Sequence, residues 1–253
     1  MPAASVCCSS GCATLDVTST RCLPIVLNRA FIYRTTQTLP GFILAVFVCL
    51  AAVFLLSLQA RAFDSAQVLQ HAQREYGASA KRSVQRWFTL LDELKGLPES
   101  TQLERVNSFW NKSVQQAEDE KVWGQTDFWA TPLDSLGKGR GDCEDFVIGK
   151  YFSLVQLGVK PEKLRFIYVR ARVQGQQIAH MVLGYYSSSD AEPLILDSLV
   201  NTIAKASSRP DLTPVFSFNV QGIYVPGARP ASVDRIGRWR SLLQRMQAQG
   251  LLP

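Results

Sequence analysis

The chain has 253 residues, 27 Lys and Arg against 21 Asp and Glu, and six cysteines. The first 62 residues account for half of the basic excess and for most of the cysteines, because they carry four arginines, one aspartate and five of the cysteines. The rest of the chain holds 23 basic and 20 acidic residues. This near balance argues against a nucleic-acid partner, which needs a clear excess of basic charge. About 190 residues remain, enough for one domain with a hydrophobic core.

An uncharged and mostly apolar segment, residues 36–59, precedes this balanced part of the chain. Two arginines lie before the segment, and Ala60-Arg61-Ala62 follows it as an A-x-A pattern of small residues. These features are typical of a secretory signal peptide. The apolar run is also close to the roughly 20 residues of a membrane anchor. We therefore expect residues 1–62 to be an N-terminal extension with a signal peptide or anchor, and residues 63–253 to be one exported domain.

Helical periodicity dominates the first half of this domain. Gly77 is expected to end a first helix, and Gly96-Leu97-Pro98 a second, while Ser100 or Thr101 can cap a third. The aromatic-rich segment 123–132 is expected to be a loop that leads to a helix opened by Cys143. The expected helices span residues 64–76, 79–94, 100–110 and 143–157.

The second half of the domain has the composition of β-strands, with turn residues between apolar runs. Ser232 is expected to cap a final helix, in which Trp239, Leu242, Leu243 and Met246 form one apolar stripe. Helices followed by a meander of antiparallel strands predict an α+β fold. The expected strands span residues 164–170, 178–186, 194–199 and 215–225.

Cys143 lies in the most informative motif of the chain, Gly141-Asp142-Cys143-Glu144-Asp145. It is the single cysteine of residues 63–253, so it has no disulfide partner within the exported domain. The start of a helix favours a thiolate over a thiol, because the positive end of the helix dipole lies there. The alternative is that Cys143 is an inert packing residue.

His180 and Asp197 follow Cys143 on two of the expected strands. A thiolate, an imidazole and a carboxylate that orients it are the parts of a cysteine acyl-transfer enzyme. Taken singly, His180 is also compatible with a core histidine, and Asp197 with a turn residue. The order of a helix with Cys, a strand with His and a strand with Asp is that of papain-like and transglutaminase-like enzymes. We therefore predict a catalytic triad of Cys143, His180 and Asp197.

Carboxylates flank the predicted nucleophile and would raise its pKa, which opposes its activation. A bound cation resolves this difficulty, and the hard oxygen ligands Asp142, Glu144 and Asp145 suit Ca²⁺. The same three residues also suit helix capping, with Asp142 as the cap and the other two in the first turn. A zinc site is disfavoured, since two histidines and one cysteine leave too few typical ligands.

Several motifs resemble the bacterial transglutaminase-like cysteine proteinases of the LapG type. The likeness covers most of residues 63–253. It rests on the segments 123–132 (WGQTDFWATP) and 139–145 (GRGDCED), on Lys150-Tyr151, on residues 180–183 (HMVL), and on Leu196-Asp197.

This resemblance implies a transglutaminase-like or papain-like core, a triad of Cys143, His180 and Asp197, and calcium ligands at Asp142 and Glu144. It implies a calcium-dependent periplasmic endopeptidase that cleaves a large surface adhesin near its N-terminus, typically at a dialanine, and so promotes biofilm dispersal. It also implies an inner-membrane receptor for cyclic di-GMP that sequesters the protease. Amide transfer or deamidation by the same fold, and a non-catalytic calcium-binding interaction module, stay open as alternatives.

Overall fold

The computed structural model describes residues 65–225 and 227–252. All of them belong to the second of the two units into which the chain divides, Arg61–Pro253. The expected signal peptide or anchor within residues 1–62 lies outside the described residues and stays a prediction. Within the described ranges, no helix has the length and hydropathy needed to cross a bilayer.

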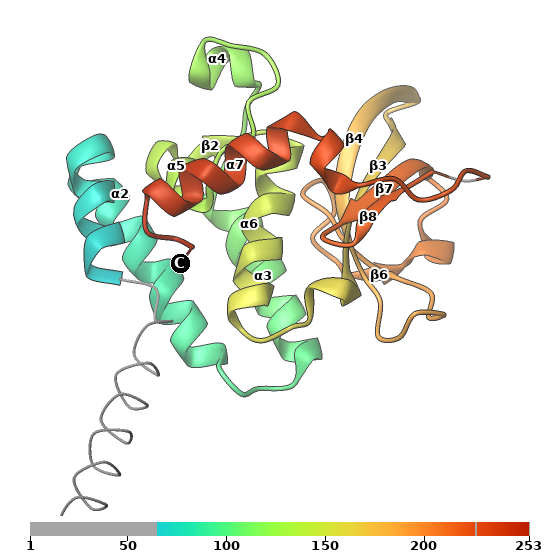
Figure 1. The fold of residues 1–253 in the computed structure, drawn as a ribbon, viewed down its shortest axis with the longest axis horizontal. Coiled ribbons are helices and arrows are strands. Elements are labelled where there is room, and N and C mark those ends of the chain that lie inside the picture. Colours follow the sequence, from blue (N-terminus) through green and yellow to red (C-terminus); the bar gives the residue numbers. More distant parts are fainter. Residues whose placement is uncertain (1–64, 226, 253) are drawn as a thin grey trace, which may run out of the picture. The chain divides into compact units, whose positions relative to one another are not determined.

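The first half of the described chain is helical, as predicted (Figure 1). The two expected N-terminal helices form one element, α2 (Ser65–Leu94), which is kinked at Gly77 where φ is 84°. Helix α3 (Glu99–Ser113) follows the expected break. Two helices too short to show an amphipathic period, α4 (Asp119–Trp123) and α5 (Pro132–Lys138), flank the aromatic-rich loop. Helix α6 (Cys143–Gln156) begins at the predicted nucleophile.

The second half forms an antiparallel sheet in the order β6-β5-β4-β3-β7-β8, which confirms the α+β prediction. The predicted simple meander is wrong, because the chain returns after β6 and pairs β7 with β3. A separate parallel pair joins β1 (Gln115–Gln116) to β2 (Arg140–Gly141), directly before α6. The strands of the large sheet are β3 (Leu164–Val173), β4 (Gln176–Tyr185), β5 (Leu194–Leu196), β6 (Ala204–Lys205), β7 (Leu212–Asn219) and β8 (Gly222–Tyr224).

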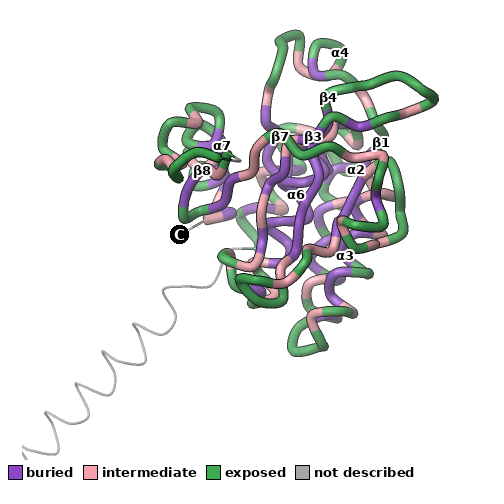
Figure 2. Tube along the Cα trace, turned by 90° about the vertical axis from the view of Figure 1, so that its right-hand side faces the viewer, coloured by how far each residue is buried: buried purple, intermediate pink, exposed green. Residues whose placement is uncertain are grey.

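Helix α6 is the buried centre of the domain. It contacts α3 and α5 on one side and β4 on the other, and its residues 145–154 are all buried (Figure 2). Ser153 Oγ accepts the indole N–H groups of Trp87 at 2.8 Å and Trp110 at 2.9 Å, and donates to the carbonyl of Gly149 at 2.7 Å. These bonds fix α6 against α2 and α3, and therefore fix the position of Cys143.

The last helix, α7 (Gly237–Ala248), holds the loop before α5 in place. Its predicted cap was wrong: Ser232 instead caps the short 3₁₀ turn η4 (Val233–Arg235). Arg245 Nη2 donates to the carbonyl of Trp129, and beyond the helix Gln249 Oε1 accepts from Thr131 Oγ1 at 2.6 Å. The C-terminus thus secures residues 129–131, a segment more than 100 positions earlier in the chain.

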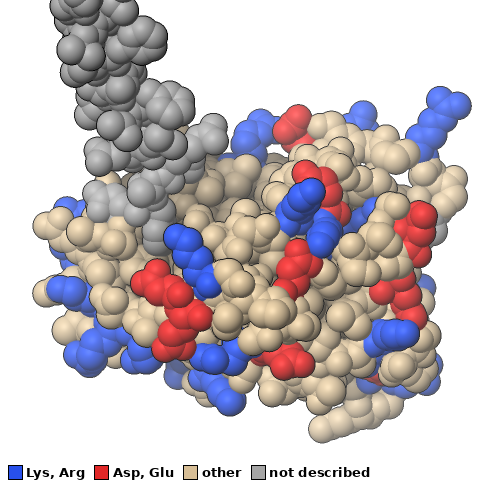
Figure 3. Space-filling model, turned by 90° about the horizontal axis from the view of Figure 1, so that it is seen from below, with Lys and Arg blue, Asp and Glu red and all other residues tan. Residues whose placement is uncertain are grey.

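Acidic and basic side chains are interspersed on the face of the molecule seen in Figure 3. On that face of the described chain, no broad field of one sign develops. The near balance of basic and acidic residues in the domain is thus also visible on this face.

Replacing Gly149 by Ala is expected to lower the free energy of unfolding by about 1–3 kcal/mol, the usual cost of overpacking. An added Cβ would lie 2.5 Å from ring atoms of Trp110, which is fully buried and held by Ser153. Chemical denaturation measures the change. Gly237→Ala is the control, because its Cβ would meet no atom within 4 Å. Equal stability of the two variants would contradict the close packing of α6 on α3.

Candidate active site

Backbone geometry around Gly141 sets the start of α6. A Cβ on Gly141 would lie 2.5 Å from Asp145 Oδ2, so only glycine lets this carboxylate fold back toward the preceding strand. Asp145 Oδ2 accepts the N–H of Asp142 at 3.3 Å, and its Oδ1 accepts the N–H of Ala130 at 2.7 Å. Asp145 therefore ties the helix start to the loop that the C-terminus secures.

His180 and Asp197 form a buried pair. His180 Nε2 lies 2.7 Å from Asp197 Oδ1, and the two side chains are 3% and 0% exposed. A carboxylate can only accept, so Nε2 carries the proton and Nδ1 is left to face outward from the pair. Burial alone would raise the pKa of Asp197, but hydrogen bonds from His180, the Leu199 N–H and Arg209 lower it to about 2. Asp197 lies just beyond β5, because the strand expected over 194–199 ends at Leu196.

Cys143 and His180 line one open cleft of about 790 Å³. The backbone N–H of Met181, the residue after His180, interacts with the Cys143 sulfur. The start of α6 and strand β4 therefore bring the predicted nucleophile and the predicted base to the same cleft. Asp197 joins them through its bond to His180. Sequence reasoning grouped these three side chains. In the structure Cys143 and His180 line the cleft, and Asp197 is joined to them through its bond to His180.

The surroundings of Cys143 favour its neutral thiol form over the thiolate. Its sulfur donates to Glu144 Oε2 at 2.7 Å. Burial, followed by the negative charges of Glu144 and Asp142, raises the pKa of Cys143 well above its usual range, and the Met181 N–H opposes this only in part. The helix dipole at the start of α6 was expected to lower the pKa of the thiol, but burial and the flanking carboxylates outweigh this effect.

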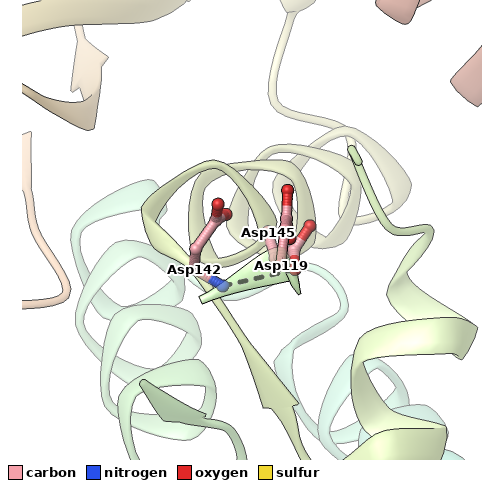
Figure 4. Close-up of side chains that lie close together, drawn as sticks. All are labelled: Asp119, Asp142 and Asp145. Atoms are coloured by element: carbon pink, nitrogen blue, oxygen red, sulfur yellow. Dashed lines mark hydrogen bonds between the residues drawn. The ribbon is translucent and has the colours of Figure 1, made fainter. Parts of the chain in front are cut away.

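Three aspartates, Asp119, Asp142 and Asp145, form an acidic cluster (Figure 4). One carboxylate oxygen of each lies within 4.8 Å of the others, and the three carboxylates point to the same side. Two of the predicted metal ligands belong to this cluster. The third, Glu144, does not belong to it and accepts the thiol proton instead. Asp119 was missed, since it comes from α4 and no local pattern links it to the cysteine motif.

The acidic cluster fits a cation. Asp119 Oδ1 and Asp142 Oδ1 are buried and have no hydrogen-bond partner among the described residues, whereas backbone N–H groups already hold Asp119 Oδ2 and Asp145. Burial, then repulsion from Glu144, Asp145 and Asp119, raises the pKa of Asp142 to about 10. Burial likewise raises the pKa of Asp119 and Asp145. An all-oxygen set of acidic ligands is the type that calcium prefers.

These raised pKa values predict how calcium and pH act together on stability. In the metal-free fold the three carboxyls stabilise while protonated, so their contribution is complete below about pH 4. This stabilising contribution is lost as the pH rises, and for Asp142 the loss extends through its pKa of about 10. In EGTA we therefore expect Tm to fall between pH 5 and pH 8, and the gain in Tm on adding calcium to grow over the same range.

Thermal melting of the full chain with calcium and with EGTA checks this expectation. Asp119→Asn should remove most of the calcium-dependent gain in Tm, because it removes one charged ligand. Glu120→Gln is the matched control, since Glu120 is exposed on the same short helix and lies outside the cluster. A calcium effect that shrinks as the pH rises would contradict the assignment.

Comparisons with known proteins identify the family of this chain. The family model of the bacterial transglutaminase-like cysteine proteinases (BTLCP) matches residues 80–210. A solved structure of Legionella pneumophila LapG is 40% identical, with 72% of this chain and 95% of that chain covered and a TM-score of 0.63. An EGTA-treated form of that protein is 39% identical, with 74% and 100% covered and a TM-score of 0.64. A comparison with curated protein sequences found no match.

A calcium-bound structure of Legionella pneumophila LapG is also similar, at 41% identity, with 72% of this chain and 98% of that chain covered and a TM-score of 0.62. The relative thus takes calcium, and this chain has an acidic cluster that can hold the ion. The matched model and these structures together establish that the chain belongs to the family of bacterial transglutaminase-like cysteine proteinases.

Proposed function

We propose that this protein is a calcium-dependent periplasmic cysteine endopeptidase that cleaves a large cell-surface adhesin near its N-terminus, at a dialanine. Cleavage would release the adhesin and promote biofilm dispersal. One observation carries the catalytic part: Cys143 and His180 open to the same cleft, and Asp197 bonds the far nitrogen of the imidazole. Family membership supports the protease activity. The resemblance to LapG-type enzymes supports the adhesin as substrate.

Each member of the triad has one task in this reaction. Cys143 gives its thiol proton to His180 Nδ1, and the resulting thiolate attacks the carbonyl carbon of the scissile bond. The backbone N–H groups at the start of α6 stabilise the oxyanion. His180 then gives a proton to the leaving amine as the C–N bond breaks, which leaves a thioester on Cys143. Water, deprotonated by His180, hydrolyses the thioester and restores the thiol. Asp197 keeps the proton of His180 on Nε2 throughout.

Calcium supplies positive charge beside the thiol. Asp119, Asp142 and Asp145 would hold the ion, with their unpartnered oxygens as the first ligands. Once these charges are balanced, the thiol loses much of the repulsion that keeps it protonated. Glu144 lies between the cluster and the sulfur, so its negative charge acts on both.

The cleft suits an extended peptide. Strand β4 pairs with β5 only over residues 183–185, so residues 176–182 of β4 have no neighbouring strand on that side among the described elements. Such a free edge can bind a peptide by adding it as another strand. Ala117 and Ala179 line the same cleft as Cys143. Cleavage between small residues is proposed on the resemblance to LapG-type enzymes.

The resemblance to LapG-type enzymes is also the basis for the regulation that we propose. An inner-membrane receptor for cyclic di-GMP would sequester the protease in the periplasm, and a nucleic-acid partner is not expected. The alternative functions are amide transfer or deamidation through the same thioester, and a non-catalytic calcium-binding interaction module.

Calcium is expected to speed the alkylation of Cys143 by iodoacetamide at pH 7, because each unit by which the thiol pKa falls raises the thiolate fraction about tenfold. Glu144→Gln should speed alkylation in EGTA, since it removes the carboxylate that accepts the thiol proton. Mass spectrometry of the peptide with Cys143 measures the rate. Glu118→Gln, an exposed glutamate of the same cleft, is the control. A wild-type alkylation rate that is the same with and without calcium would contradict the electrostatic coupling between the calcium site and the thiol.

The purified full chain is expected to cut an N-terminal adhesin fragment from the same cell in calcium but not in EGTA. Cys143→Ala and His180→Ala should each lower the rate by at least about a thousandfold, because they remove the nucleophile and the general acid–base group. Gel electrophoresis and mass spectrometry identify the products.

The same assay separates the alternatives. A product that carries an added primary amine in place of a new C-terminal carboxylate would favour amide transfer. Full biological effect of the Cys143→Ala variant, with no cleavage by the wild type, would favour the non-catalytic module and overturn the proposed function.

A further inference from the structure

Each oxygen of the Asp197 carboxylate has its own buried partner. Oδ1 faces His180 Nε2 at 2.7 Å, and Oδ2 accepts from Arg209 Nη2, also at 2.7 Å. Arg209 follows the 3₁₀ turn η3 (Ala206–Ser208) and is 7% exposed. Its side chain therefore holds the carboxylate on the side away from the imidazole.

Arg209 is itself held rigidly. Asp211 accepts two bonds from its guanidinium, from Nε at 2.9 Å and from Nη2 at 2.7 Å. The carbonyl of Asp211 accepts the N–H of Arg172 at 2.9 Å, which anchors this turn to the end of β3. A two-point contact between a planar guanidinium and a carboxylate fixes orientation as well as distance, which a lysine cannot do.

The other groups around Asp197 do not replace this contact. The Leu199 N–H donates to Oδ1 at 3.0 Å, and Asn111 Nδ2 donates to the Asp197 carbonyl at 2.8 Å. The Lys150 amine, fully buried on α6, attracts Asp197 electrostatically but makes no hydrogen bond among the described residues. Without Arg209, Oδ2 would be a buried charged oxygen with no partner, and the carboxylate would be free to turn away from His180.

We propose that Arg209 is the positioning residue of the reaction: its guanidinium, braced by Asp211, fixes the Asp197 carboxylate in the orientation that holds the His180 imidazole toward Cys143. This inference rests on the proposed function, because it concerns the same histidine. Arg209 touches neither substrate nor thiol in this role and acts through Asp197 alone.

Steady-state cleavage by full-length variants tests the proposal. Arg209→Met should lower kcat on the order of tenfold to a hundredfold, part of the 10²–10⁴ that general acid–base catalysis supplies, with KM unchanged. Arg209→Lys should lose less, since it keeps the charge without the fork, and Asp211→Asn should shift kcat in the same direction by a smaller factor. Arg172→Met is the control, because Arg172 is exposed beside the same turn.

A second measurement needs no substrate. The chain has only two histidines, so ¹⁵N-histidine NMR resolves His180, with His71→Gln as the assignment variant. In the wild type and in Arg172→Met, Nε2 should carry the proton in a strong hydrogen bond. In Arg209→Lys and Asp211→Asn, which keep a polar group and are expected to fold, this signal should weaken or move. Thermal melting checks that each variant is folded.

The outcomes separate this inference from the proposed function. A folded Arg209→Met variant with wild-type kcat and an unchanged His180 signal would overturn the positioning role. If the wild type cleaves no adhesin and Cys143→Ala changes nothing, the proposed protease function is disproved. The NMR signal of His180 still tests the positioning role of Arg209 in that case. A drop in kcat that comes with an equal rise in KM and an unchanged signal would also overturn the role.

Discussion

Repulsion among carboxylates at the start of α6 is the constraint on which the site depends. Asp119, Asp142 and Asp145 are crowded together with the Cys143 thiol, and Glu144 bonds the sulfur directly. Burying such charges without a partner costs several kcal/mol each, so they take up protons unless a cation balances them. The thiol is subject to the same field. In the proposed function, metal binding and nucleophile activation are therefore one electrostatic event rather than the work of two independent sites.

The scaffold keeps this unfavourable cluster in place. Helix α6 cannot move away, because Ser153 bonds two buried indoles on α2 and α3, and β4 packs on its other side. The loop that donates an N–H to Asp145 is secured from the distant C-terminus, where Arg245 bonds the carbonyl of Trp129. Packing and backbone hydrogen bonds thus offset the local repulsion. An acidic site of this kind needs rigid support, since separating its carboxylates would relieve the strain without an ion.

Features that depend on a local sequence pattern could be predicted, whereas features that depend on contacts between distant parts of the chain could not. Cys143 at a helix start could be predicted because glycines and an apolar period mark that helix locally. The strands with His180 and the region of Asp197 carry an equally local pattern. Asp119 and Arg209 could not be predicted, because each joins the site only through tertiary packing and has no spacing signature of its own. The return of β7 to β3 is likewise a choice among sheet edges that no strand pattern specifies.

Two acidic centres with opposite pKa shifts lie within one small domain, and this contrast divides their roles. Asp197, between His180 and Arg209, is held ionised with a pKa of about 2, while burial and neighbouring charges raise the pKa of Asp142 to about 10. Environments that push such values apart commonly separate catalytic tasks. In the proposed function, the His–Asp pair is thus oriented by protein groups alone, whereas activation of the thiol depends on the ion. Removing calcium would silence the nucleophile and leave the imidazole oriented, so activity can return without any rearrangement of the sheet.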